Sequence, residues 1–123
     1  MKRDTVTNAL NEIMNAKRAK KREVVLKNHS KLLRNILDIA KEADYLDYSF
    51  DKNMLKVKIK NLNMIKAIKP RYTVSVKKID FYVRRFLPAK NFGIIIISTN
   101  KGLITQLEAE EKNLGGFLIA YIY

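Results

Sequence analysis

Four consecutive isoleucines, at residues 94–97, constrain the fold more than any other feature of this chain. β-Branched side chains favour extended backbone, and a short apolar run is typical of a strand that is buried on both faces. The run is far shorter than the roughly 20 apolar residues that span a bilayer. The sequence therefore predicts a strand over residues 92–98 inside a sheet, and the rest of the chain must cover that sheet.

The first 62 residues switch between helical and strand patterns. A helix is predicted from an N-cap at Asp4 or Thr5, and a second one begins at Ser30. The apolar positions at helical spacing are Val6, Ala9, Leu10, Ile13 and Met14, then Leu33, Ile36, Leu37 and Ala40. Residues 24–26 form a short apolar run, and residues 45–51 and 54–60 alternate around a turn at 51–53. This half therefore has the predicted order α-β-α-β-β.

The second half, residues 63–123, is predicted to be mostly β with short helices. Residues 67–77 alternate through Tyr72, with Pro70 limiting the start of that strand to an edge or a bend. A short helix over 79–86 precedes Pro88, and a capping box at 105–108 opens another that ends near Asn113. Residues 117–123 form a last strand. The chain is thus predicted as α+β in two small lobes, 1–62 and 63–123.

The amino-acid composition limits the classes of function that the chain can have. Lys and Arg number 25 against 12 acidic residues, for a formal charge of +13, and the excess is spread over both halves, which favours a polyanionic partner. Cysteine is absent and His29 is the only histidine, so thiol chemistry, cysteine–zinc sites and paired-histidine catalysis are excluded. We expect a soluble protein of a reducing compartment, with no signal peptide, membrane span, cofactor or metal.

Residues 98–105 form the most informative polar stretch. They are interpreted as a loop that leaves the buried strand and enters the capped helix. Their hydroxyls, amide, lysine and glycine suit a sugar–phosphate backbone and a ribose 2′-OH. An ordinary strand-to-helix connection is an equally good interpretation, and the stretch lacks the pattern of a P-loop. The candidates are Ser98, Thr99, Asn100, Lys101, Gly102 and Thr105.

Two basic clusters are further candidates. The first contains Lys17, Arg18, Lys20, Lys21 and Arg22, which either contact phosphates or form a solvated helix end. The second contains Lys69, Arg71 and Tyr72, which suit phosphate contact with base stacking, unless Tyr72 lies in the core. Lys56, Lys58 and Lys60 are better explained as the solvated face of a sheet.

A stripe of Asn8, Asn11 and Asn15 on the first helix is unusual, because asparagine is a poor helix former. The amides either read RNA functional groups or are simply exposed. His29 is expected in a turn. The acidic residues 108, 110 and 111 do not indicate paired-carboxylate catalysis, so we expect no enzyme.

The chain resembles the family of small-subunit ribosomal protein eight over nearly its whole length. The strongest part runs from Phe92-Gly93-Ile94 through the Ser-Thr-x-x-Gly-(hydrophobic)₂-Thr stretch to Gly115-Gly116 and an aromatic terminus. Asn8-Ala9-Leu10 and Ser30-Lys31-Leu32 are similar to the starts of the family's first two helices. Residues 67–72 and 85–89 look like the archaeal and eukaryotic branch. The chain departs from the family at His29 and in lacking a glycine near Arg22.

The resemblance implies a monomeric, non-catalytic protein that binds the central domain of small-subunit ribosomal RNA early in assembly, in the cytoplasm, beside neighbouring ribosomal proteins. It adds Gly115, Gly116 and Lys31 to the candidate RNA-binding residues, and supports Asn8 and Asn15. The competing hypothesis is a basic module that binds double-stranded DNA, for which the asparagine stripe offers the only candidate recognition helix. An RNA-acting enzyme is the third, and it has few residues to use.

Overall fold

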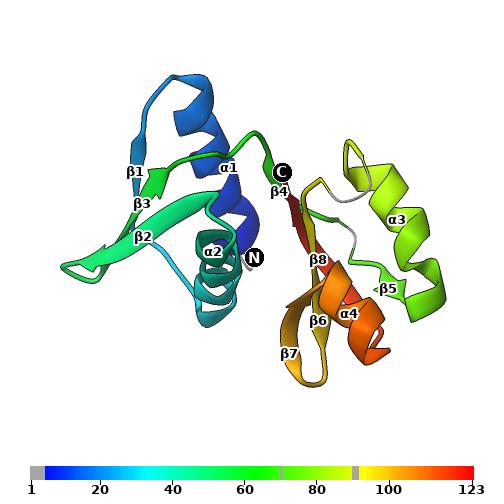
Figure 1. Cartoon of the computed structure of the whole chain (residues 1–123). Helices are drawn as coiled ribbons and strands as arrows, with labels where there is room; N and C mark the ends of the chain where they lie inside the picture. Colours follow the sequence, from blue (N-terminus) through cyan, green and yellow to red (C-terminus); the bar gives the residue numbers. More distant parts are fainter. Residues whose placement is uncertain (1–4, 70, 90–91) are drawn as a thin grey trace. The chain divides into compact units, whose positions relative to one another are not determined.

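The computed structural model describes residues 5–69, 71–89 and 92–123, which divide into two compact units between Lys66 and Ala67 (Figure 1). The predicted α+β class is confirmed. The predicted cap at Asp4 and the strand-limiting Pro70 lie outside the described residues.

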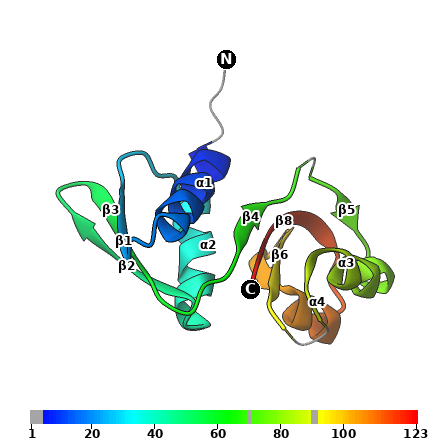
Figure 2. The ribbon, with the colours of Figure 1, turned by 90° about the horizontal axis from the view of Figure 1, so that it is seen from above.

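The first unit is a three-stranded antiparallel sheet with two helices on one face (Figure 2). The chain order is α1 (Thr5–Arg18), β1 (Glu23–Leu26), α2 (Lys31–Glu42), β2 (Leu46–Asp51) and β3 (Met54–Ile59), as predicted. The predicted apolar positions of both helices are buried, and the sheet order is β1-β3-β2. The Ser30 hydroxyl caps α2 by accepting a hydrogen bond from the Leu33 N–H.

The β2–β3 hairpin turns through two residues with positive φ, Lys52 (50°) and Asn53 (66°). A two-residue turn of this kind matches the twist of the strands. Phe50, which alternates with Leu46 and Tyr48 in sequence, lies near this turn and is 58% exposed. The alternating pattern of burial therefore fails at the end of the hairpin.

The second unit is built on β6 (Ile94–Thr99), the predicted isoleucine strand. Its sheet has the order β4-β8-β6-β7, with β5 also pairing β8. β4 (Ile65–Ala67) spans the boundary between the two units. The further elements are β5 (Thr73–Val74), a 3₁₀ turn (Val76–Lys78), α3 (Ile79–Phe86), β7 (Gly102–Thr105), α4 (Gln106–Lys112) and β8 (Gly116–Ile122). Ile95 and Ile97 pack into one core cluster with Val83 of α3 and Ala109 of α4.

One register shift shapes the central pair of strands. Ile96 pairs with Ala120, but the next residue, Ile97, pairs with Leu118, which leaves Ile119 as an extra residue in β8. This is a β-bulge. It allows Leu118 and Tyr121 to pack against the same core cluster as Ile95 and Ile97.

The predicted strand over residues 67–77 is wrong in its extent. Only Ile65–Ala67 and Thr73–Val74 are strands, and Val76 begins the 3₁₀ turn. The end of β5 is set by the partner strand: Val74 pairs with Gly116, the first residue of β8, so residues 75–77 have no strand to pair with.

Candidate nucleic-acid interface

Residues 98–105 form a β-hairpin, which corrects the prediction of a loop. β6 and β7 pair from Ile96↔Thr105 to Thr99↔Gly102, and Asn100 and Lys101 form the turn. Gly102 has a φ of 112°, which favours glycine, and no other residue lies near the position of its missing Cβ. The polar sequence hid β7, because only Leu103 and Ile104 are apolar and neither has a long alternating neighbourhood.

Two of the predicted hydroxyls hold the hairpin and the helix in shape. The Thr99 hydroxyl donates to the Gly102 carbonyl (2.9 Å) and accepts from the Lys101 N–H (3.1 Å). The Thr105 hydroxyl accepts from the Glu108 N–H (3.3 Å), which is the predicted cap of α4. Both threonines therefore have a structural explanation.

Ser98, Asn100 and Lys101 differ from these threonines. Within the described part of the chain, their side chains make no hydrogen bond or ion pair. Ser98 is half-buried on the central strand, while Asn100 and Lys101 are exposed at the turn. They are the hairpin groups that remain available to a ligand.

An exposed aromatic residue beside Ser98 escaped the sequence analysis. Ser98 pairs with Phe117 on β8 and with Leu103 on β7, and Phe117 pairs with Thr73 on β5. Directly opposite residues share a face of a sheet, so these four side chains form a row across it. Phe117 is 50% exposed. Its position after two glycines is the signal that could have indicated an unusual surface residue.

Gly116 determines how closely β8 approaches the hairpin. A Cβ at Gly116 would lie 2.0 Å from the Ser98 carbonyl oxygen, and one at Gly115 would lie 2.6 Å from the Val74 carbonyl oxygen. Both glycines are thus required by backbone contacts within the unit. Their effect on a ligand would be indirect, through the position of Ser98.

The members of the cluster of Lys69, Arg71 and Tyr72 differ in their exposure to solvent. Lys69 and Arg71 are exposed, whereas Tyr72 is half-buried and packs against the core cluster. The Tyr72 ring stacks on Tyr82 at 6.0 Å between centroids, and the Arg85 guanidinium lies 5.7 Å from its centroid. The ring therefore already has two partners.

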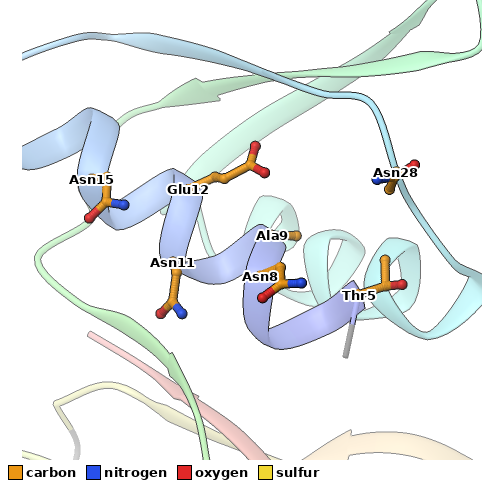
Figure 3. A pocket seen from close by; sticks show the side chains of 7 residues that line it. All are labelled: Thr5, Asn8, Ala9, Asn11, Glu12, Asn15 and Asn28. Carbon is orange, nitrogen blue, oxygen red and sulfur yellow. The ribbon is translucent and has the colours of Figure 1, made fainter. Parts of the chain in front are cut away.

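In the first unit, the asparagine stripe lines a hollow of about 290 Å³ (Figure 3). Asn8, Asn11 and Asn15 of α1 are exposed. Asn28, on the segment after β1, lies across the hollow from the helix, and the sequence analysis did not select it. The remaining lining residues are Thr5, Ala9 and Glu12.

The basic cluster that follows is the end of α1 and its turn. Lys17 is half-buried, and Arg18, Lys20, Lys21 and Arg22 are exposed. Lys17 and Arg18 lie in the last helical turn, where cations interact favourably with the helix dipole. Lys31, the first residue of α2, is exposed as well.

Lys56, Lys58 and Lys60 are exposed, as expected for the solvated face of a sheet. Lys56 pairs with Glu23 (3.3 Å) and Lys60 with Asp44 (3.5 Å). His29 lies before the cap of α2, as expected for a turn, and bonds Arg34 (2.7 Å) and the Asn53 carbonyl (3.0 Å). These contacts explain Lys56, Lys60 and His29 as parts of the scaffold.

Neither a metal site nor a membrane helix is found in the described ranges. No group of three or more His, Cys, Asp or Glu side chains there could hold a metal ion. The helices described are all too short or too polar to cross a bilayer.

The fold and surface define a class: a small, strongly basic α+β protein whose exposed polar groups are presented on a hairpin and a helix. The family model described as ribosomal protein S8 matches residues 4–123. The chain belongs to this family, which confirms the resemblance found in the sequence.

The curated relatives include several archaeal proteins named small ribosomal subunit protein uS8. Those of Archaeoglobus fulgidus and Methanococcoides burtonii are 37% and 38% identical, each over 98% of this chain, covering 98% and 97% of the relative. That of Thermoplasma acidophilum is 35% identical over the full length of both chains. The archaeal character predicted from residues 67–72 and 85–89 agrees with these matches.

Proposed function

We propose that this protein is a structural, non-catalytic component of the small ribosomal subunit that binds the central domain of the subunit's RNA directly. The observation that carries this is the match to relatives named small ribosomal subunit proteins over 98–100% of the chain. The charge of +13 supports a polyanionic partner. The protein binds as a monomer in the cytoplasm, early in assembly, and then lies beside neighbouring ribosomal proteins.

The second unit supplies selectivity in this proposal. Ser98 is held on a strand that is paired on both sides, so its hydroxyl has a fixed position from which to contact a 2′-OH or a minor-groove edge. Lys101 at the turn contacts a phosphate, and Asn100 lies beside it. Thr99, Thr105, Gly102, Gly115 and Gly116 act by positioning these groups.

The first unit supplies further affinity. The exposed cations after α1 and Lys31 neutralise phosphates, which makes binding depend on salt. Asn8 and Asn15 contact ribose or base edges from the rim of the hollow. Lys69 and Arg71 add phosphate contacts to the second unit.

The direct test compares binding to a central-domain RNA fragment with binding to duplex DNA of equal length at two salt concentrations. Tight RNA binding that persists at the higher salt, with loss of DNA binding, supports the proposal. Equal and equally salt-sensitive binding to both would leave only a charge effect, whereas preferred binding of duplex DNA would favour the DNA-binding alternative.

Two substitutions in the hairpin separate affinity from selectivity. Lys101→Ala should weaken RNA binding and reduce the slope of log affinity against log salt by about one. Ser98→Ala should leave that slope unchanged and reduce discrimination against RNA with altered helix geometry. Lys112→Ala is the matched control, because Lys112 pairs with Glu108 on α4. An unchanged slope for Lys101→Ala would remove Lys101 from the contact surface.

A further inference from the structure

Helix α3 and the 3₁₀ turn before it carry a concentrated positive charge. Lys77, Lys78, Arg84 and Arg85 are exposed, and the one acid among them, Asp80, is bound by Arg84 at 3.0 Å. Lys77 and Lys78 have no ion pair among the residues that the structure describes. The surface is therefore complementary to an anion, and the candidate residues of the proposed function do not include it.

An aromatic ring projects from the middle of this charge. Phe81 is 58% exposed, because α3 buries its opposite side through Ile79 and Val83. Phe81 lines two open hollows. One, of about 640 Å³, is lined by Lys77, Asp80, Phe81, Arg84 and Arg85; the other, of about 490 Å³, is lined by Thr73, Val74, Ser75, Lys78, Phe81 and Tyr82.

The Phe81 ring also packs against a group of other aromatic rings. Phe81 contacts Tyr82 edge-to-face at 5.1 Å, and Tyr82 in turn stacks on Tyr72 (6.0 Å) and Phe86 (6.2 Å). Arg85 lies over the rings of Tyr72 and Phe86, at 5.7 and 5.5 Å from their centroids. These contacts hold the inner rings together, so the exposed aromatic surface here belongs to Phe81.

We propose that Lys77, Lys78, Phe81, Arg84 and Arg85, here named the α3 patch, bind an unpaired RNA nucleotide. The base stacks on Phe81, and the adjoining phosphates lie in the two hollows, near Lys78 on one side and Lys77 on the other. Stacking on an aromatic ring beside cations is how proteins hold single-stranded nucleic acid. This inference rests on the proposed RNA-binding function and adds to it a contact with a non-helical segment.

The charge favours RNA over a protein partner. A protein that docked through Phe81 alone would gain nothing from four surrounding cations, whereas a nucleotide uses both the ring and the charge. An acidic peptide also has charge, but it needs no flat aromatic surface. A substitution that removes the flat ring of Phe81 but keeps an apolar side chain therefore distinguishes an RNA ligand from an acidic peptide.

The chain contains no tryptophan, which gives a direct probe. Phe81→Trp introduces a single indole at the proposed stacking position, and a short unstructured RNA oligomer should quench its fluorescence. Leu107→Trp is the matched control: Leu107 is 60% exposed but lies on the acidic helix α4, so no quenching is expected there. Equal quenching at both positions would overturn the proposal.

Affinity for the same oligomer, measured by anisotropy on the full chain, tests the chemistry. Phe81→Ala should weaken binding about ten-fold, and Phe81→Leu should weaken it as much, because leucine keeps the apolar contact but lacks the flat face. Lys77→Ala and Lys78→Ala should each reduce the salt slope by about 0.7. Full affinity in Phe81→Leu would overturn the stacking contact.

The result can be separated from that of the proposed function. If the central-domain fragment binds but Phe81→Ala has no effect on the oligomer, only the α3 patch proposal fails. If the fragment does not bind the wild-type chain, the proposed function fails whatever the oligomer does. Quenching of the Phe81→Trp variant by oligoglutamate and not by RNA would assign the surface to an acidic protein and overturn the proposal.

Discussion

Three helices in the described part of the chain are followed, within two residues, by a residue that has positive φ and is not glycine. Lys20 (61°), Asp44 (65°) and Asn113 (57°) follow α1, α2 and α4. After α1, the Lys20 N–H donates to the Lys17 carbonyl and the Lys21 N–H donates to the Ala16 carbonyl, which is the Schellman pattern. Glycine is the usual residue at this position, since a side chain there costs about 1 kcal/mol or more. The turn around Lys20 therefore keeps a cation at the expense of stability.

Lys20→Gly should raise the free energy of unfolding by about 1 kcal/mol, because glycine adopts positive φ without strain. Lys21→Gly removes the same charge one residue later, where φ is not positive, and should be neutral or destabilising. Urea denaturation of both variants measures the difference. Equal effects would show that charge repulsion, and not backbone strain, limits stability at this turn.

Tyr48 links β2 to α2 through its hydroxyl, which donates to a carboxylate oxygen of Asp38. Burial, and next the hydrogen bond to Asp38, raise the pKa of Tyr48 from 10.0 to about 12. The neutral phenol is thus favoured in the folded state. Its contribution to stability is complete below pH 10 and is lost as the pH rises from 10 to 12.

Tyr48→Phe should lower the free energy of unfolding by about 1 kcal/mol below pH 10, through loss of the hydrogen bond. The difference from wild type should shrink between pH 10 and 12, because the phenol of the unfolded wild-type chain ionises in this range while the folded one stays protonated. Urea denaturation across this range measures both, and the titration of lysines cancels in the difference. A difference that stays constant with pH would show that the bond to Asp38 does not stabilise the fold.

At the scale of elements, the closeness of β8 to β6 depends on Gly116. Gly116→Ala should destabilise the protein by about 1–3 kcal/mol, because the added methyl collides with the Ser98 carbonyl and the strand is paired on both sides. Phe117→Ala, at the exposed neighbour, should cost less than 1 kcal/mol. Thermal unfolding compares the two. A stable Gly116→Ala variant would mean that β6 can move and that Ser98 is not fixed.

The helices and strands that could be predicted from the sequence are those whose formation depends on side chains within their own segment. The isoleucine strand, both long helices and the capped helix α4 carry their burial pattern and caps within one segment. β5 and β7 could not be predicted, because their lengths are set by where β8 and β6 offer pairing positions. The sequence indicates the polar hairpin residues as candidates, but only the structure separates the occupied hydroxyl of Thr99 from the free one of Ser98.

At the scale of the whole molecule, the chain has two lobes that we propose to be separate folding domains, 1–62 and 63–123. Residues 60–64 contain no helix or strand, and Lys60, Lys66 and Arg71, in or near this stretch, are exposed. A protease needs an extended segment, which the tight turns at Lys52 and Lys101 do not offer. Brief native trypsin digestion should therefore cut first within residues 60–71 and give two complementary fragments by mass spectrometry. A first cut at Lys52 or Lys101 would contradict this.

The bulge in β8 has a consequence for how this protein can change in evolution. With Ile119 as the extra residue, Leu118 and Tyr121 both pack against the helices, and Phe117 falls on the opposite face beside Ser98. Deleting one residue from this stretch would reverse the faces of all residues on one side of the deletion. Point substitutions can vary the exposed Phe117, but insertions and deletions would exchange the side chains of two faces that are both largely buried, since Leu118 lies on one and Ala120 and Ile122 lie on the other. The length of the final strand is therefore under a stricter constraint than the identity of its exposed residues.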